Sequence, residues 1–222
     1  MIRILVTGFG AFPGAPVNPT QTLVRRLSSH HARTLQRLSI DVRPAVLPVV
    51  YDEVELAITD LLAKERPQIV LHLGLAARRK TISVEARAKN RLSIVHPDSS
   101  RQRAGVMHVT PGVTPERAAR WPVERLCNAI TQAGFRATRS IDAGDYLCNQ
   151  ALYLSLGKHD GLCGFLHVPR LRKKWRLENP DEYGIEFPPR RPSMAELERS
   201  VIAAIRVMAV EHRRQHSGKS SA

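Results

Sequence analysis

The stretch Gln68-Ile69-Val70-Leu71-His72-Leu73-Gly74 is the most strand-like run in the chain. Its apolar residues are continuous rather than alternating, which is typical of a strand buried on both faces of a parallel sheet. His72 lies inside the run and is expected to be a core residue. Pro67 ends the helical pattern that comes before it. The stretch therefore predicts the buried strand of an α/β fold.

Strand and helix patterns alternate on both sides of this run. Extended segments are expected at 3–7, 40–50, 82–90, 137–141 and 161–169. Helices are expected at 19–29 and 51–64, from Thr114 to Gly134, after Cys148 and after Ser193. This alternation predicts a single domain over residues 1–222, with a tail that frays from about residue 213. The expected architecture is a three-layer α/β sandwich whose mostly parallel central sheet is flanked by helices.

Composition limits the class of protein. With 43% hydrophobic residues among 222, the chain is expected to fold around a sizeable core. No run approaches the roughly 18 apolar residues of a membrane span, and residues 1–6 look like a strand rather than a signal peptide. Three cysteines without a C-x-x-C pair argue against a disulfide scaffold or a zinc site. We expect a cytoplasmic protein with no membrane contact and no metal.

The formal net charge of +14 raises the question of nucleic-acid binding. The basic residues are, however, spread over small separate clusters along the chain. The chain also has only four Tyr, five Phe and two Trp for base stacking, and none of them forms a ribonucleoprotein-type motif. We therefore favour an arginine-rich surface over a nucleic-acid partner.

A glycine-rich loop, Gly8-Phe9-Gly10-Ala11-Phe12-Pro13-Gly14, follows the first expected strand. Its spacing matches neither the dinucleotide-binding fingerprint nor the P-loop, so nucleotide binding is not expected. Ligands bind at the carboxyl ends of strands in open α/β sheets. Phe9 and Phe12 are therefore candidates to line a small apolar pocket, and ordinary packing of the loop is the alternative.

The segment Ile141–Gln150 carries a short turn into a helical pattern and places Cys148 at the start of the helix. Backbone N–H groups at a helix start favour thiolate over thiol and can stabilise an oxyanion. The alternative is that Cys148 is a small buried core residue. Asp142 and Asp145 are close in sequence, but a carboxylate beside the sulfur opposes thiolate formation. The orienting acid of a catalytic group is thus sought elsewhere.

A cysteine nucleophile needs a base, and the base needs a third group that fixes its tautomer. His167 is the best base because it lies at the end of a buried-type strand, whereas His96 lies in a long polar loop and is a second candidate. Glu85 is the best acid because it lies on the polar face of an alternating strand. The alternative is that Glu85 is an ordinary solvated charge on the strand face.

Four segments together carry a resemblance to a known family: Thr7–Phe12, Ile82–Glu85 with Asn90, Ala143–Asn149 and Gly164–Pro169. They resemble pyroglutamyl peptidase I, also called pyrrolidone-carboxylate peptidase, in matching order over nearly the whole chain. The resemblance implies an α/β sandwich that removes N-terminal pyroglutamate from peptides in the cytoplasm without a cofactor. It also implies a homo-oligomer, a dimer or a tetramer.

The resemblance also implies residue roles. Cys148 would be the nucleophile, His167 the base and then the acid, and Glu85 the residue that orients His167. Five residues are expected at the substrate pocket: Phe9, Phe12, Tyr146, Leu75 and Asn18. The first three would flank the pyrrolidone ring, whereas Asn18 is also a good helix cap.

Two positions depart from the family pattern. Leu75 stands where the family usually has a Gln that binds the lactam, and Val95 stands where an Arg is common. A lost hydrogen-bond partner can cost about 1–3 kcal/mol, which is enough to redirect specificity without abolishing chemistry. Two alternatives therefore stay open. One is a related cysteine amidohydrolase with altered small-group specificity, and the other is a non-catalytic basic binding protein on the same fold.

Overall fold

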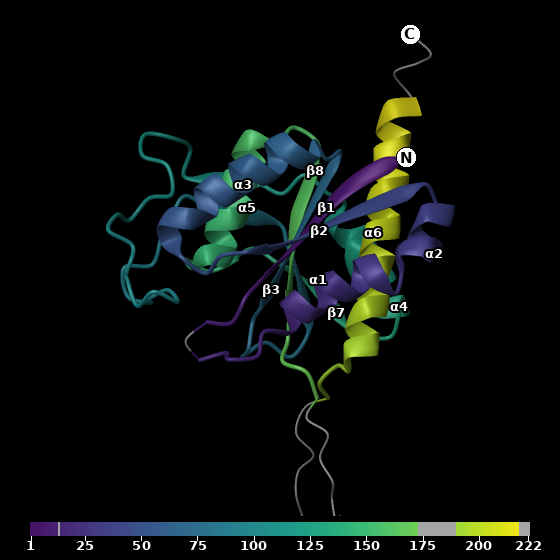
Figure 1. Ribbon diagram of the computed structural model, residues 1–222, viewed down its shortest axis with the longest axis horizontal. Helices are drawn as coiled ribbons and strands as arrows, with labels where there is room; N and C mark the ends of the chain where they lie inside the picture. Colours follow the sequence, from purple (N-terminus) through teal and green to yellow (C-terminus); the bar gives the residue numbers. More distant parts are fainter. Residues whose placement is uncertain (13, 173–189, 218–222) are drawn as a thin grey trace, which may run out of the picture.

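A computed structural model describes residues 1–12, 14–172 and 190–217. Its centre is a six-stranded sheet (Figure 1). The strand order is β2 (Ile40–Leu47), β1 (Ile2–Phe9), β3 (Ile69–Leu75), β8 (Leu162–Val168), β4 (Ile82–Glu85) and β7 (Ala137–Ser140). Every neighbouring pair is parallel except β8 and β4, which are antiparallel. The predicted α/β class with a mostly parallel sheet is confirmed.

Helices cover both faces of the sheet, so that the molecule has three layers (Figure 1). One layer contains α1 (Pro19–Ser29), α2 (Ala32–Arg37), α4 (Val123–Gln132) and α6 (Met194–Ser217), and the opposite layer contains α3 (Tyr51–Glu65) and α5 (Leu147–Lys158). Two apolar clusters fill the spaces between the sheet and these layers. None of the helices that the structure describes has the length and apolarity to cross a membrane.

Strand β3 lies in the interior of the sheet, between β1 and β8. Its residues from Ile69 to Gly74 are all buried, as the continuous apolar run predicts. His72 is a core residue whose ring nitrogens bond to Thr7 Oγ1 at 2.6 Å and to Ser155 Oγ at 2.8 Å. Since Ser155 belongs to α5, these two buried hydrogen bonds link that helix to the sheet.

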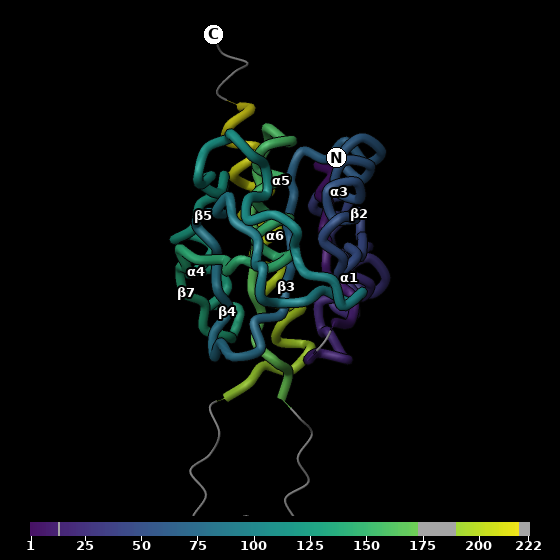
Figure 2. Tube along the Cα trace, turned by 90° about the vertical axis from the view of Figure 1, so that its left-hand side faces the viewer, coloured from purple at the N-terminus to yellow at the C-terminus, as the bar shows by residue number. Residues whose placement is uncertain are grey.

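The segment after β4 differs from the expected pattern. The predicted strand 82–90 breaks at Ala86, and β5 (Arg87–Lys89) forms a separate antiparallel pair with β6 (Glu116–Ala118). The predicted helix from Thr114 is therefore wrong over its first turns, because residues 116–118 are taken up by this pairing. Helix α4 begins only at Val123. The intervening residues 90–115 form a long loop on the side of α3 and α5 (Figures 1 and 2).

Helix ends follow the sequence signals in two places. Asn18 caps α1 by accepting a hydrogen bond from Thr20 N at 3.1 Å. Ser193 and Glu196 form the expected capping box of α6, since Glu196 Oε2 accepts from Ser193 N at 2.8 Å. Helix α6 continues to Ser217, beyond position 213, from which the sequence predicted fraying. The predicted loop or lid 171–192 lies largely outside the described residues.

Candidate active site

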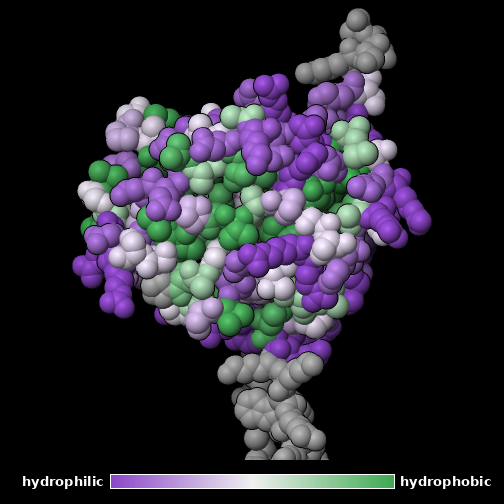
Figure 3. Space-filling model, viewed as in Figure 1, coloured by the Kyte–Doolittle hydropathy of each residue, from purple (hydrophilic) through white to green (hydrophobic). Residues whose placement is uncertain are grey.

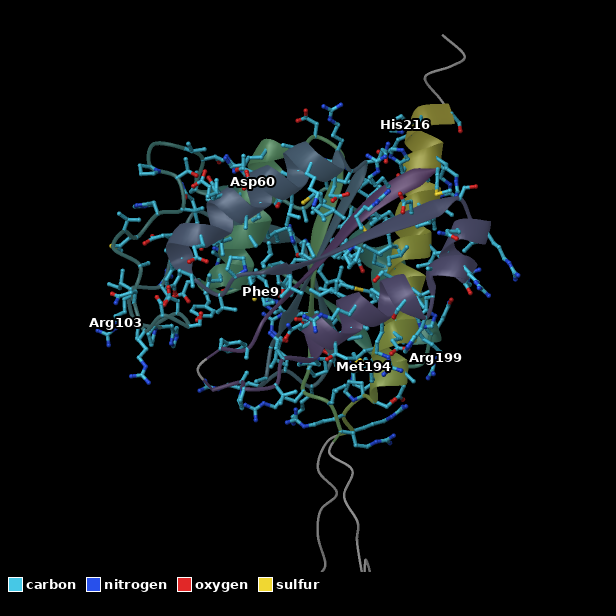
Figure 4. The ribbon with its side chains drawn as sticks, viewed as in Figure 1. Phe9, Asp60, Arg103, Met194, Arg199 and His216 are labelled. Atoms are coloured by element: carbon cyan, nitrogen blue, oxygen red, sulfur yellow. The ribbon has the colours of Figure 1, made fainter. Side chains whose placement is uncertain are left out.

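Helix α5 delivers Cys148 to the carboxyl edge of the sheet. Tyr146 is the extended cap residue of this helix, and Cys148 is the second residue of its first turn. Among the described residues, no side chain caps the helix start, so its first backbone N–H groups are available to an anion. Figure 4 labels Phe9, which ends β1 at this same edge of the sheet, whereas Arg103 of the long loop lies at the outer margin of the molecule.

Gly74, near the end of β3, gives the Cys148 sulfur room against the sheet. A Cβ atom at position 74 would lie 2.7 Å from Cys148 Sγ and 2.5 Å from Cζ of the buried Phe165. Both distances are shorter than real Cβ contacts. Gly74 is also the register partner of His167 on β8. The missing side chain therefore allows the sulfur to approach the strand ends where His167 lies.

His167 and Glu85 form a buried hydrogen-bonded pair. Glu85 Oε1 lies 2.8 Å from His167 Nδ1, and the two residues are 0% and 4% exposed. They come from β4 and β8, the one antiparallel pair of the sheet. A bond at Nδ1 leaves Nε2 as the ring nitrogen that is free for proton exchange. The reading of Glu85 as a solvated surface charge is therefore wrong.

Two further residues hold Glu85, and neither was singled out in the sequence. Arg79 Nη1 donates to Glu85 Oε1 at 2.6 Å, and Trp121 Nε1 donates to the Glu85 backbone oxygen at 3.0 Å. Arg79 belongs to the cluster 78–80, which looks like one of several ordinary basic clusters. Its position just after the end of β3 is one signal that points to the site.

The ionisation of the cysteine differs from the sequence expectation. Burial, aided by the Glu85 charge, raises the pKa of the Cys148 thiol to about 12, and the Arg79 charge opposes this rise. Burial also lowers the pKa of His167, whereas the hydrogen bond that His167 makes to Glu85 raises it. Burial therefore opposes the effect of the helix start on the thiol, and it favours the neutral forms of Cys148 and His167.

This ionisation predicts slow alkylation of Cys148 in the free protein. Because the thiolate is the reactive form, a raised pKa leaves little of it near neutrality. We expect the iodoacetamide rate at Cys148 at about pH 7 to be lower than that of a free cysteine and to keep rising above about pH 9. Mass spectrometry of the peptide that contains Cys148 measures this rate separately from Cys127 and Cys163. A fast rate that stays constant from acidic to neutral pH would instead indicate a preformed thiolate–imidazolium pair.

A small, mostly apolar pocket adjoins the sulfur. It is lined by Phe9, Phe12, Asn18, Val49, Leu75, Tyr146, Leu147 and Cys148. The structure thus brings all five residues expected at the substrate pocket to one place beside Cys148. Val49 was not expected there, and its position before α3 carries no motif that would have indicated it.

The aromatic wall of this pocket is braced from the long loop and from α3. Tyr146 donates its hydroxyl hydrogen bond to Pro97 O at 3.0 Å. Its ring packs edge-on against the Tyr51 ring, with 5.6 Å between the ring centroids, and its centroid lies 6.2 Å from that of Phe12. Val95 is 65% exposed and does not line the pocket. The side chain of Asn18 is used locally, since its Nδ2 donates to Gly10 O at 3.0 Å and its Oδ1 caps α1.

A larger cavity, of about 370 Å³, lies at the opposite end of β8. Asp160, Leu162 and Glu211 are among its lining residues, and none of the predicted site residues contributes to it. In the described part of the chain, no three His, Cys, Asp or Glu side chains cluster as metal ligands.

Comparisons with known proteins identify the family of the chain. The sequence profile of the pyroglutamyl peptidase family matches residues 2–213. The chain is 31% identical over 173 residues to the pyrrolidone-carboxylate peptidase of Pyrococcus furiosus, which covers 76% of this chain and 81% of that protein. The fold of this chain is similar to the crystal structure of a mutant pyrrolidone carboxyl peptidase from P. furiosus. The TM-score is 0.80 and the identity 28%, over 95% of this chain and 99% of the other. The Thermus thermophilus pyrrolidone carboxyl peptidase gives a TM-score of 0.76 with 34% identity, over 92% and 99% of the two chains. The chain belongs to the pyroglutamyl peptidase family.

Proposed function

We propose that this protein is a cysteine exopeptidase that removes an N-terminal pyroglutamyl group from peptides through a thioester. The observation that carries the proposal is one arrangement at the sheet edge. Cys148 begins a helix beside an apolar pocket, and the buried His167–Glu85 pair, with its 2.8 Å bond, lies on the strands next to it. A nucleophile, a base and an orienting acid are the components of acyl transfer by cysteine.

Acylation transfers the pyroglutamyl group from the peptide nitrogen to the Cys148 sulfur. Cys148 Sγ attacks the pyroglutamyl carbonyl carbon as its proton passes to His167 Nε2. Backbone N–H groups at the start of α5 hold the oxyanion that forms. The carbon–nitrogen bond then breaks, His167 gives the proton to the leaving amine, and the pyroglutamyl group remains as a thioester on Cys148.

Deacylation reverses the proton path. His167 Nε2 takes a proton from a water molecule, whose oxygen attacks the thioester carbonyl. The carbon–sulfur bond breaks, the sulfur recovers the proton, and free pyroglutamate leaves. Glu85 holds the ring through Nδ1 in both half-reactions and stabilises the imidazolium that each of them forms.

The pocket supports a neutral N-terminal group. None of the described residues that line it is Asp or Glu, so the ammonium of an ordinary peptide would lose its hydration there without a counter-charge. The lactam of pyroglutamate carries no charge, and its flat ring suits a space between Phe9, Phe12 and Tyr146. This contrast supports pyroglutamyl over aminoacyl substrates. Leu75 adds apolar surface where the usual family residue would add a hydrogen bond.

Hydrolysis of pyroglutamyl-aminomethylcoumarin tests the proposal directly. We expect kcat/KM at least about 100-fold above that of prolyl- or alanyl-aminomethylcoumarin, because burying an unpaired ammonium costs more than about 3 kcal/mol. Prior alkylation by iodoacetamide at about pH 9, carried to completion, should abolish turnover. Faster cleavage of another small acyl group would favour the amidohydrolase alternative that Leu75 and Val95 leave open. Salt-dependent nucleic-acid binding without any thiol-dependent hydrolysis would favour a binding protein.

Three broader expectations belong to the same proposal. A catalytic thiol is best preserved in a reducing compartment, which supports the cytoplasm. Residues 1–222 are expected to form one domain.

Self-association is supported by apolar side chains that remain exposed, among them Val17 at 78% and Leu56 at 64%. Figure 3 likewise shows apolar side chains in the middle of one face, inside a mostly polar margin. A dimer or tetramer would cover such surface.

A further inference from the structure

The Arg79 side chain joins three segments at the candidate site. Its Nη1 donates to Glu85 Oε1 at 2.6 Å and contacts Ser140 Oγ at 3.3 Å, and its Nη2 donates to the Asp142 backbone oxygen at 2.7 Å. Glu85 ends β4, Ser140 ends β7, and Asp142 begins the turn into the Cys148 helix. One planar guanidinium therefore bonds both to the orienting acid and to the turn that delivers the sulfur.

The hydrogen bond from Arg79 to the Glu85 carboxylate is stronger than its bond to the Asp142 carbonyl, because both partners are charged. Glu85 is 0% exposed, and its Oε1 accepts from both Arg79 and His167. Its Oε2 is buried and has no hydrogen-bond partner among the residues that the structure describes. A buried carboxylate needs a counter-charge, and Arg79, whose side chain is 31% exposed, supplies it from the solvent side. Without Arg79, the His167 ring would be the one described partner left to the Glu85 carboxylate oxygens.

The contact with Asp142 fixes the entry to α5. The Asp142 carboxylate already accepts from Gly144 N at 3.0 Å and pairs with Lys89 Nζ at 3.0 Å. Gly144 has a φ of +84°, which makes this turn a tight one. The bond from Arg79 to the Asp142 carbonyl adds the link between this turn and Glu85. Movement of the turn relative to Glu85 would therefore strain the guanidinium bonds.

We propose that Arg79 is a positioning residue, which holds the Glu85 carboxylate against His167 and keeps that pair in register with the turn that carries Cys148. The proposal rests on the proposed function for its substrate but not for its effect on the thiol. Arg79 does not line the pocket beside Cys148. Its loss should therefore lower kcat and leave KM nearly unchanged.

Electrostatics give the proposal a second readout. The positive charge of Arg79 lowers the pKa of both Cys148 and His167, whereas Glu85 raises both. Lys89 and Asp142 also carry charge near the turn, but they are paired with each other. Removing the Arg79 charge should therefore move both pKa values upward. The whole pH profile of kcat/KM then shifts to higher pH, whichever of the two groups governs each limb.

The experiment compares three variants with the unmodified protein. Arg79→Met removes both charge and fork, Arg79→Lys keeps the charge but cannot span two acceptors in the same geometry, and Arg78→Met removes a charge from the exposed neighbouring position. The readouts are site-specific alkylation of Cys148 by iodoacetamide at about pH 9, and kcat and KM for pyroglutamyl-aminomethylcoumarin over a pH series. Melting temperatures show whether each variant is folded.

For Arg79→Met we expect alkylation at least about threefold slower, which corresponds to a pKa rise of half a unit. We also expect kcat to fall about 100-fold with KM nearly unchanged, and the pH profile to shift upward. Arg79→Lys should keep the alkylation rate and the pH profile while kcat falls about tenfold. Arg78→Met should match the unmodified protein in every readout. If Arg79→Met does not fold, the kcat of Arg79→Lys decides the matter.

A folded Arg79→Met variant with normal alkylation and normal kcat would overturn the proposal, as would full kcat in Arg79→Lys. Equal effects in Arg78→Met would show that general surface charge is responsible, and would overturn it too. The alkylation arm needs no substrate. If the unmodified protein fails to cleave pyroglutamyl-aminomethylcoumarin, the proposed function fails while the effect of Arg79 on the thiol is still measured.

Discussion

Replacing Cys148 by alanine is expected to lower kcat for pyroglutamyl-aminomethylcoumarin by at least about 10⁴-fold, a loss of the size seen when a catalytic nucleophile is removed. The thioester cannot form without the sulfur, and neither His167 nor Glu85 lies where it could take over the attack. The fold should survive, because the side chain is partly exposed to the pocket and alanine is only slightly smaller. Binding of a pyroglutamyl peptide should also survive, since the aromatic walls remain.

The matched control is Cys127→Ala, which removes a thiol from α4 on the other face of the sheet. This variant should keep its kcat and its inhibition by iodoacetamide. Calorimetry of pyroglutamyl-peptide binding to Cys148→Ala separates lost chemistry from lost binding. Turnover above about one per cent of normal in Cys148→Ala, or loss of iodoacetamide inhibition in Cys127→Ala, would remove Cys148 from its assigned role.

The sheet could be predicted where one residue pattern decides burial. The apolar run of β3 is continuous because both faces are covered, and the structure buries it between β1 and β8. The predicted helix start at Thr114 was wrong because no local residue pattern determines the structure there. Residues 116–118 have no strong pattern of their own and become a strand only by pairing with residues 87–89, almost thirty positions earlier. Such long-range pairing is invisible to local periodicity.

The components of the candidate site could be predicted, but their ionisation could not. Cys148 lies at the start of a helix and His167 near the carboxyl end of β8, and such ends meet at one edge of an α/β sheet. Glu85 reaches His167 differently, across the antiparallel pair of β4 and β8. A helix start indicates a lower thiol pKa, whereas the degree of burial, which raises it, depends on the packing of Phe165, Gly74 and the pocket around the sulfur. Local sequence describes the first of these effects and contains no measure of the second.

Gly74 shows the same limit more sharply, since in the sequence it is only the last residue of an apolar run. Gly74→Ala is expected to lower kcat at least about 100-fold, because displacing a reacting group by about 1 Å costs a factor of this size. The added methyl would lie 2.7 Å from Cys148 Sγ and 2.5 Å from Phe165 Cζ. Phe165 is fully buried and packs 4.6 Å from the His167 ring, so the strain would reach the sulfur and the imidazole together. We also expect a stability loss of about 1–3 kcal/mol from overpacking.

The control for Gly74→Ala is Gly105→Ala in the exposed long loop, where an added Cβ has none of the described residues within 4 Å. This variant should keep its kcat and its melting temperature. Urea unfolding gives the stability change of each variant, and kcat measured well below the melting temperature gives the catalytic change. If Gly74→Ala loses stability but keeps its kcat, the close approach of the sulfur to β3 serves packing alone. A kcat loss in a variant that remains folded at the assay temperature would instead mean that the missing side chain at position 74 sets the path of the sulfur to His167.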